Sequence, residues 1–544
     1  MATMLHPGVY VREIPGGPRS IEGVPTSTTI FVGETERGPS TPTRILGRSQ
    51  YERLFGGYRR HVAGGVPERL LMPYSLDGFF NNGGSQAYVL RAIAADAVTA
   101  FRSSDGDEVI EASSPGLWGN SLSVAIASSN DGDGARRRIA VFYHRPGTDP
   151  GADPELVEEF DQLSPDPTDA SFIRDVLQRS RYIRWRTDAA VPDPLPAIDN
   201  AALVPRASED LLRTHAVDLA GGTGGDTTVE AADLPGLLDR GLAGVDDAAL
   251  LVCASAALTP DANLAGADFN DVENVFANFA RNRPRQDMFF VGDLPRLVRG
   301  ASLPAAGDPV QGALDAVNGA NDIPAASAVP LNNFNSAYWP HVIVPDPIGE
   351  GSRPRLAVPP AGHIAGLYAR TDGRRGVWKA PAGTEARIQG AVEVDFNVLD
   401  AHQDLLNPRG INAIRPIPGA GLVCWGARTR EPNSEWRYVP VRRTAIFLRS
   451  SIYNGIQWAV FEPNDQRLWQ SLRNTIGAFM ETQFRNGAFA GATSREAYFV
   501  KVDAETTTEA DQAAGVVNIL VGFAPLRPAE FVSVSLQQKT ASAQ

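Results

Sequence analysis

The pattern of apolar and polar residues is clearest in the last third of the chain, between residues 439 and 489. Apolar side chains recur there at helical spacing, with one polar exception at Gln483; they are Leu468, Leu472, Ile476, Phe479 and Phe484. This spacing predicts an amphipathic helix that buries one face. Pro463 and Asn464 supply a start, and Asn486-Gly487 supplies a stop, because Gly accepts the left-handed backbone of many helix ends.

Three β-prone segments follow this helix, at residues 496–503, 516–524 and 529–537. In the last segment the apolar residues Val532, Val534 and Leu536 alternate with a mostly polar set that begins at Phe531, which is typical of a strand with one buried face. We therefore predict a helix packed on a small sheet, with a short strand at the end of the chain. Such a strand can pair with its own sheet or with the sheet of another molecule, and the pattern leaves both open.

The first 97 residues combine a short arm with an α/β pattern. Residues 9–14 are β-prone, with Val9, Tyr10, Val11 and Ile14 as the apolar or aromatic positions, and prolines on both sides separate them from the next segment of the chain. Beyond this arm, strands are predicted at 26–33 and 87–94, and helices near 51–57 and 70–80. We interpret residues 21–97 as one compact α/β domain.

Residues 98–216 have β-and-loop character. Strands are predicted at 118–126 and 138–144, joined by an Asn-Asp-Gly-Asp-Gly loop at 130–134. This loop looks like a calcium site, but it lacks the distal Glu and the spacing of an EF-hand, so a hairpin turn is preferred. Pro-rich pieces bound a helical patch near 172–184. We expect an inserted, surface-facing, β-rich domain.

From residue 217 the pattern alternates between strands and helices. A glycine turn at 219–226 is followed by a strand at 248–254, a helix at 271–283 and a strand at 288–292. This order predicts βαβ units and a partly parallel sheet. The glycine turn has neither the Gly-Lys-Ser/Thr ending of a P-loop nor the spacing of a dinucleotide-binding loop, so it is not predicted to hold phosphate.

Composition narrows the class of protein. A chain of 544 residues suggests three to four domains, and its net charge of −13 argues against a nucleic-acid binder. Cys253 and Cys424 lie in apolar runs without metal-ligand spacing, which predicts buried free thiols and a reducing compartment. We find no secretory signal and no apolar run of membrane-spanning length, and we therefore expect synthesis and assembly in the cytoplasm.

Hydrolysis is the enzymatic alternative. A nucleophilic triad needs Ser, His and a carboxylate brought together, and the isolated candidates are Ser255, His363 and Asp372. No Gly-x-Ser-x-Gly motif is present, and we expect His363 to lie in a loop before a strand at 364–368, where its role is structural. No catalytic, cofactor-binding or metal-binding residue is predicted.

Several segments of the sequence resemble contractile tail sheath proteins, which form the contractile sleeves of phage tails and of phage-tail-like injection systems. The C-terminal phrases are GVWKAPA at 376–382, LNPRGINAIR at 406–415, YVPVRR at 438–443, VFEPN at 460–464 and EAYFVK at 496–501. The N-terminal phrases are PGVYVREIP at 7–15, TSTTIFVG at 26–33 and NNGGSQAYVLRA at 81–92. The resemblance is weak only between about 100 and 217.

This resemblance implies a structural subunit that polymerises helically around an inner tube and contracts, without a cofactor. It also implies a subtilisin-like α/β middle domain and arms that extend the sheet of neighbouring subunits. The implied partners are further copies of the chain, an inner tube protein, and baseplate and tail terminator proteins. The Arg-rich composition and the long insertion favour an injection system over a phage tail. The alternative is a cytosolic α/β hydrolase-like enzyme.

The sequence thus predicts a multidomain α/β and α+β protein. Its expected parts are an N-terminal arm (1–20), an α/β domain (21–97), an inserted β-rich domain (98–216), a subtilisin-like middle domain (217–375), a core helix-and-sheet domain (376–528) and a C-terminal arm (529–544).

Overall fold

The computed structural model describes residues 20–63, 66–93, 97–102, 110–133, 135–144, 153–186, 206–223, 234–255, 267–296, 308–318, 332–431, 435–531 and 533. The chain divides into two compact units. The C-terminal unit contains the segment up to Pro25, Arg375–Ala380 and the chain from Pro440 onward. The sheet unit contains Thr26–Arg374 and Pro381–Val439.

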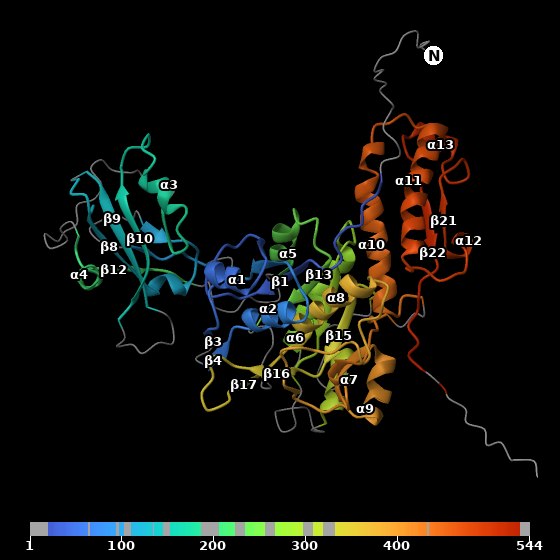
Figure 1. The fold of residues 1–544 in the computed structure, drawn as a ribbon, viewed down its shortest axis with the longest axis horizontal. Helices are drawn as coiled ribbons and strands as arrows, with labels where there is room; N and C mark the ends of the chain where they lie inside the picture. Colours follow the sequence, from blue (N-terminus) through green and yellow to red (C-terminus); the bar gives the residue numbers. More distant parts are fainter. Residues whose placement is uncertain are drawn as a thin grey trace, which may run out of the picture. The chain divides into compact units, whose positions relative to one another are not determined.

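An eight-stranded sheet organises the sheet unit (Figure 1). Its strands, in spatial order, are β2 (Thr43–Ile45), β5 (Ala87–Arg91), β1 (Thr29–Gly33), β13 (Leu250–Cys253), β14 (Phe289–Asp293), β15 (Asn335–Trp339), β19 (Ile411–Ile417) and β20 (Gly421–Cys424). The six central strands are parallel, and β2 and β20 close the two edges in antiparallel fashion. The prediction of a partly parallel sheet built from βαβ units is therefore confirmed.

The central strands are buried on both faces. Every residue of β1, β14 and β15 is buried. Burial on both faces explains why β1 and β14 are mostly apolar without alternation, whereas β15 also buries the polar residues Asn335 and Ser336. Strand β1 pairs with β5 on one side and with β13 on the other. The predicted division into separate domains at 21–97 and 217–375 is thus wrong, because strands from both segments complete one sheet. Strands β19 and β20 belong to it as well, so residues 381–439 are not part of the C-terminal core.

The sheet unit also contains helices and two small sheets. The helices are α1 (Arg48–Phe55), α2 (Met72–Asn81), α5 (Leu234–Leu242), α6 (Ala267–Asn282), α7 (Pro309–Asn318), α8 (Ala361–Arg375), α9 (Asp400–Leu406) and η3 (Asn407–Arg409). The small sheets pair β3 (Arg60–Ala63) with β4 (Val66–Arg69), and β16 (Val342–Pro345) with β17 (Arg355–Val358) and β18 (Glu393–Val394).

Helix α8 contradicts the predicted loop and strand around residue 363. Its glycines have a packing role: a Cβ at Gly362 would lie 2.4 Å from the Ser75 carbonyl oxygen, and one at Gly366 would lie 2.3 Å from that of Phe79. Both contacts are with α2, so glycine allows the two helices to approach closely. The same glycines lower helix propensity, which is why local sequence reasoning indicated a loop.

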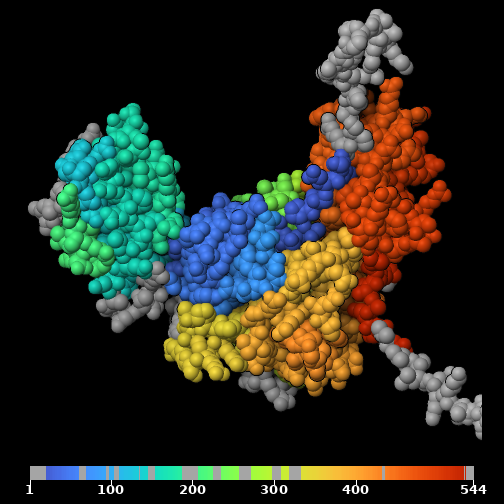
Figure 2. All heavy atoms as spheres, in the orientation of Figure 1, coloured from blue at the N-terminus to red at the C-terminus, as the bar shows by residue number. Residues whose placement is uncertain are grey.

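The insert (cyan to green in Figure 2) has its own seven-stranded sheet, in the order β10-β9-β8-β12-β6-β7-β11. Its elements are β6 (Phe101–Arg102), β7 (Ile110–Ala112), η1 (Leu117–Ser121), β8 (Leu122–Ser128), β9 (Arg137–Tyr143), β10 (Glu155–Leu163), α3 (Ile173–Leu177), β11 (Ile183–Trp185), α4 (Glu209–Thr214) and β12 (Val217–Ala220). As predicted, β8 and β9 form an antiparallel hairpin. The expected glycine turn at 219–226 begins later, because residues 219 and 220 still belong to β12; residues 224–226 lie outside the described residues.

In the C-terminal unit, α10 (Val439–Gly455) and α11 (Gln466–Arg485) lie side by side, and the strands β21 (Tyr498–Lys501) and β22 (Leu520–Phe523) pack on α11 (Figure 1). The shorter elements are η4 (Gln457–Ala459), α12 (Ser494–Ala497) and α13 (Glu509–Ala513). The predicted amphipathic helix and its packing on a small sheet are confirmed, and Gly487 has the expected left-handed backbone at φ 82°.

Three details of this unit differ from the sequence prediction. The cap of α11 is Asp465, whose carboxylate accepts hydrogen bonds from the backbone N–H groups of Arg467 and Leu468. The side chain of Asn464 instead accepts the indole N–H of Trp469 at 2.9 Å. The strands are also shorter than predicted, because residues 494–497 form α12 and residues 516–519 precede β22.

Candidate functional site

The three residues considered for hydrolysis do not form a triad. Ser255 is buried, and its hydroxyl donates to the carboxylate of Glu34. His363 is buried in α8, where burial lowers its pKa to about 4, and its Nδ1 has no hydrogen-bond partner among the described residues. Asp372 accepts a hydrogen bond from Thr26 Oγ1 at 2.6 Å. It lies nine residues from His363 on the same helix, which corresponds to about 13.5 Å along the axis.

Buried carboxyl groups near the carboxyl ends of the central strands have structural partners. Asp293 accepts the backbone N–H of Ala361 at 2.9 Å, and Glu273 accepts that of Asp293 at 3.3 Å. Burial raises the pKa of both carboxyl groups well above their ordinary values. Since these hydrogen bonds tie α6, β14 and α8 together, we interpret the two acids as packing elements.

The two cysteines are free thiols. Cys424 is buried, as predicted, and burial raises its pKa to about 12, so it is not a nucleophile at neutral pH. Cys253 is only half-buried, which corrects the prediction for that residue.

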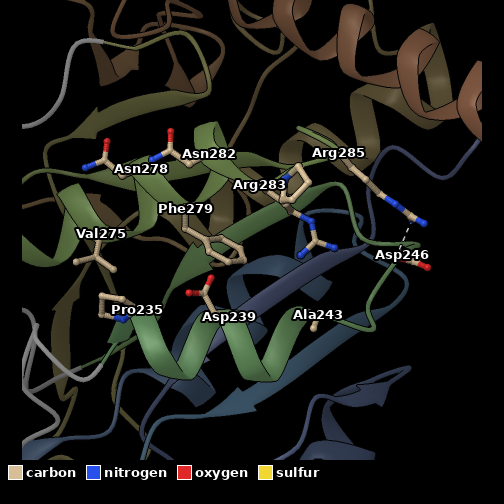
Figure 3. A pocket seen from close by; sticks show the side chains of 11 residues that line it. Pro235, Asp239, Ala243, Asp246, Val275, Asn278, Phe279, Asn282, Arg283 and Arg285 are labelled. Carbon is tan, nitrogen blue, oxygen red and sulfur yellow. Dashed lines mark ion pairs between the residues drawn. The ribbon is translucent and has the colours of Figure 1, made fainter. Parts of the chain in front are cut away.

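A pocket of about 710 Å³ lies between α5 and α6 (Figure 3). Phe279 points toward α5, and an ion pair of 2.7 Å joins Arg285 to Asp246. Arg283 fixes the end of α6, because its guanidinium donates to the carbonyl oxygens of Leu242 and Val245. The residues that line the pocket include no Ser, Thr, Cys or His, so they offer no hydroxyl, thiol or imidazole for the triad of the hydrolase alternative.

The 130–134 loop is a turn in the described part of the chain. The Asp131 carboxylate accepts the backbone N–H of Asp133 at 3.0 Å, and the Asp133 carboxylate accepts that of Ala135 at 2.9 Å. These local hydrogen bonds explain why aspartates occur at this hairpin. In the residues the structure describes, no cluster of three or more His, Cys, Asp or Glu side chains could hold a metal ion.

The two-stranded sheet of the C-terminal unit is the candidate functional site. Its inner face carries Tyr498, Val500, Val521 and Phe523, which join the apolar cluster around α11. Its outer face carries Phe499 opposite Gly522 and Lys501 opposite Leu520. Phe499 and Leu520 are each 52% exposed. Among the described residues, β21 and β22 form a ladder only with each other, and a single bridge joins Phe489 to Pro525 just beyond the end of β22. Each strand thus has one edge along which no other described strand pairs.

The hydroxyl of Tyr498 donates to the Glu481 carboxylate at 3.0 Å, which attaches β21 to α11. Burial is the main cause that raises the pKa of Tyr498 to about 12. The sheet is therefore anchored on one face and at one end, while its other face and its edges are accessible. The outward position of Phe499 could have been found from the alternation in Tyr-Phe-Val-Lys, which places every second residue on one face.

Most of the predicted arm residues lie outside the described residues; these are Val9, Tyr10, Val11, Ile14, Val532, Val534 and Leu536. Phe531 is described, is 81% exposed and is not in a strand. No helix in the described ranges combines the length and the apolar character needed to cross a membrane.

Two family models match the chain in adjacent segments. Residues 331–430 match the phage tail sheath protein central domain, and residues 431–539 match the phage tail sheath C-terminal domain. The second segment includes α10, α11 and the two-stranded sheet.

Curated relatives point the same way. The chain is 34% identical over 125 residues to the tail sheath protein of Vibrio phage KVP40, covering 23% of this chain and 19% of that protein. It is 29% identical over 205 residues to the tail sheath protein of Enterobacteria phage T4, covering 36% of this chain and 29% of that protein. The chain thus spans less than a third of the length of these two relatives.

Solved structures share the fold over nearly the whole chain. The sheath complex of the extracellular contractile injection system PVC, in its contracted state, has a TM-score of 0.56 at 20% identity and covers 99% of both chains. The contracted helical sheath of the anti-feeding prophage has a TM-score of 0.55 at 23% identity and covers 99% of this chain and 100% of that chain. A sheath tail protein from Listeria innocua has a TM-score of 0.55 at 12% identity, with coverage of 93% and 96%.

Fold and matched segments together define a tail sheath architecture, with a large mixed sheet and a C-terminal helix-and-sheet unit. Residues 331–539 of this chain match the central and C-terminal domains of phage tail sheath proteins, and the fold is shared with solved sheath structures.

Proposed function

We propose that this chain is a structural sheath subunit. It polymerises helically around an inner tube and contracts to drive the tube through a target envelope. The observation that carries this proposal is the two-stranded sheet in the segment that matches the sheath C-terminal domain, whose edges are open among the described residues. A two-stranded sheet alone is marginally stable, and exposed edges are where further strands add.

The added strands, in this proposal, are the terminal arms of neighbouring subunits. The N-terminal arm contributes Val9, Tyr10, Val11 and Ile14. The C-terminal arm contributes Phe531, Val532, Val534 and Leu536. The 81% exposure of Phe531 supports this assignment, because an apolar ring so open to water gains from being covered. Head-to-tail contacts of this kind do not close on themselves and so build helical polymers.

Main-chain hydrogen bonds link the subunits in this model. Each contributes about 1 kcal/mol net, so a few per arm, repeated over many copies, hold the lattice together. Backbone pairing also continues while whole domains shift, which suits contraction. The stored energy of the extended sleeve resides in such interfaces, and no cofactor is involved.

Truncation tests this model. Removal of residues 1–16, or separately of 529–544, is expected to leave a folded, soluble monomer that forms no sleeves in electron micrographs. Removal of 538–544 alone is the matched control, because it keeps the predicted strand and should leave sleeves unchanged. Sleeves of normal length from either longer truncation would refute the proposal that the terminal arms link neighbouring subunits.

The insert is proposed to be a peripheral module that polymerisation does not require. It has a sheet and an apolar core of its own, centred on β8 and β9. The sheet of the insert includes β12 (Val217–Ala220), and Val98 is bridged to Thr223 at its base. Replacing residues 99–222 with a short Gly/Ser linker is therefore expected to leave sleeve formation intact. A shortened protein that is folded and soluble but never forms sleeves would contradict this proposal.

The remaining partners and the middle domain belong to the same proposal. The sleeve would contact an inner tube protein, a baseplate and a tail terminator, and the α/β region around β13 and β14 would be the subtilisin-like domain of the family. No enzymatic activity is proposed: the separation of Ser255, His363 and Asp372 supports a structural role. Peptidase or esterase turnover by the wild type that is lost in both Ser255→Ala and His363→Ala would contradict the proposal that the chain has no enzymatic activity.

Of the two particle types, we propose an injection system, on the basis of the long insertion and the Arg-rich composition. Gene neighbourhood tests this choice. An AAA ATPase gene among tail genes without a capsid gene is the expected result, whereas capsid and terminase genes would assign the chain to a phage tail.

A further inference from the structure

A small basic pocket lies in the sheet unit. Its volume is about 250 Å³. Four arginines line it, Arg409, Arg428, Arg430 and Arg437, and Glu431 is the one acidic residue in its lining. The protein as a whole is acidic, with a net charge of −13, so this local excess of positive charge is unusual for the chain.

The backbone brings these arginines together from two segments. One is the turn after η3, where Gly410 has a left-handed backbone at φ 71°. The other follows β20, where the backbone N–H of Thr429 donates to the Arg437 carbonyl at 2.8 Å. A Cβ at Gly410 would lie 2.7 Å from the Thr429 carbonyl oxygen, so glycine permits the two segments to touch. The pocket is therefore part of the fold.

Arg430 is the most informative member of the cluster. It is 3% exposed, and its terminal nitrogens donate to the carbonyl oxygens of Arg409 and Val317. Its Nε has no hydrogen-bond partner among the described residues. Burial lowers the pKa of Arg430 to about 10, so it is still cationic at neutral pH. The described residues thus supply carbonyl oxygens but no ion pair for this cation, which is costly unless an anion completes the site.

We propose that this pocket binds an oxyanion, either a phosphate or a carboxylate, through Arg430 and Arg409. The planar guanidinium fork matches both groups, because two parallel N–H donors can reach two oxygens. The volume corresponds to roughly eight water molecules at about 30 Å³ each, which suits one such group with its remaining hydration. Arg409 is exposed and Arg430 is buried, so the anion would be held between the mouth and the floor of the pocket.

Two sources could supply this chemistry. One is free phosphate in solution. The other is a carboxylate of a second copy of the chain, whose 63 acidic residues exceed its 50 Lys and Arg residues. Only the second source rests on the proposed function, because it requires copies to assemble.

The first arm of the test uses the unassembled full-length chain and inorganic phosphate, with N-acetylglutamate as the carboxylate probe. Calorimetric titration at neutral pH and matched ionic strength is expected to show binding of at least one probe by the wild type. Arg409→Gln and Arg430→Gln should each weaken it at least tenfold. Arg409→Gln keeps the test valid if Arg430→Gln does not fold, because Arg409 is exposed. The matched control is Arg473→Gln, an exposed arginine on α11, which should bind like the wild type.

The second arm distinguishes the sources. If a second copy fills the pocket, phosphate added during assembly at matched ionic strength should slow sleeve growth, and Arg409→Gln alone should slow it too. If sleeve growth is unchanged in both cases, free oxyanion is the source, and the site stands. The site is disproved if neither probe binds the wild type, or if both glutamine variants bind as tightly as the wild type. Failure to form sleeves under any condition would count against the proposed function and not against the pocket, because the first arm needs no assembly.

Discussion

The two sheets of this protein differ in how far their own chain completes them. In the eight-stranded sheet, β1, β14 and β15 are wholly buried, and six central strands lie between the edge strands β2 and β20. In the two-stranded sheet, no residue of β21 or β22 is fully buried, and one face is open. The first sheet forms a hydrophobic core within the chain. The second has only two strands, and a sheet of that size is marginally stable without further strands or packing.

We therefore expect the large sheet to determine the stability of the folded chain and the small sheet to take part in the proposed assembly of sleeves. The side chains of β1, β14 and β15 contribute to the folding of the chain, because they are buried within it. Phe499 and Leu520 on the outer face of the small sheet are half-exposed, so they contribute little to the folding of the chain; in the proposed assembly they contact neighbouring subunits. The comparison predicts opposite consequences for aromatic residues in the two places.

The largest expected effect is at Phe31 in the centre of β1. Its side chain is fully buried and packs edge-on against Phe79, with ring centroids 5.3 Å apart. Phe31→Ala should lower the free energy of unfolding by about 3–5 kcal/mol, through lost burial and the cavity left behind. Denaturant unfolding of the soluble chain measures this change. Phe31→Leu is the control and should cost about 1.5 kcal/mol or less. A loss below about 1 kcal/mol in Phe31→Ala would show that the sheet is less tightly packed than its burial indicates.

The sequence predicted those parts of the fold whose pattern is local. The stripe from Leu468 to Phe484 identified α11, and the uninterrupted apolar run around Leu250 identified a buried parallel strand, because each pattern reflects its own burial. It did not predict that β1 and β13 pair, since strand order depends on contacts between segments more than 200 residues apart.

The sequence failed where tertiary contacts override local preference. Gly362 and Gly366 weaken a helix in isolation, yet contact with α2 selects them in α8. At the start of α11, Asn464 and Asp465 are both good caps, and only the hydrogen bond of Asn464 to Trp469 decides between them. At the candidate site, alternation predicts a terminal strand at 529–537, most of which lies outside the described residues. The basic pocket has no local signal, because its arginines come from two separate segments that only the fold brings together.

A smaller effect is expected at His363, which packs against Gly78 beneath the large sheet. Its pKa is about 4 in the folded chain and 6.5 ordinarily, so between these values only the unfolded chain binds the proton. The free energy of unfolding therefore falls as the pH drops from 6.5 to 4. The full loss is about 3 kcal/mol, at roughly 1.4 kcal/mol per pH unit.

His363→Leu should remove the pH dependence that His363 gives to the free energy of unfolding. Between pH 6.5 and pH 4 the free energy of unfolding should therefore fall by up to about 3 kcal/mol less in the variant than in the wild type. Comparison of the two proteins cancels contributions of opposite sign from buried acids such as Glu273. At pH 8 both states carry a neutral histidine, and the difference there measures packing alone. Parallel stability curves for the two proteins from pH 8 to pH 4 would contradict the prediction.

The smallest effect on monomer stability is expected at Phe499, on the outer face of the two-stranded sheet. Its ring is 52% exposed and lies over Gly522, where an added Cβ would be 2.2 Å from the ring. Phe499→Ser should change the free energy of unfolding by roughly 0.5 kcal/mol or less, as is usual for exposed positions. Sleeve yield in electron micrographs should nevertheless fall, because an arm added beside β21 would lose the apolar surface that the ring provides.

The matched control is Leu46→Ser in the sheet unit, which removes a side chain that is 63% exposed and should leave sleeves unchanged. If Phe499→Ser forms sleeves as readily as the control, the outer face of the small sheet is not an assembly surface. The proposed difference between the two sheets, one serving folding and the other assembly, would then be wrong.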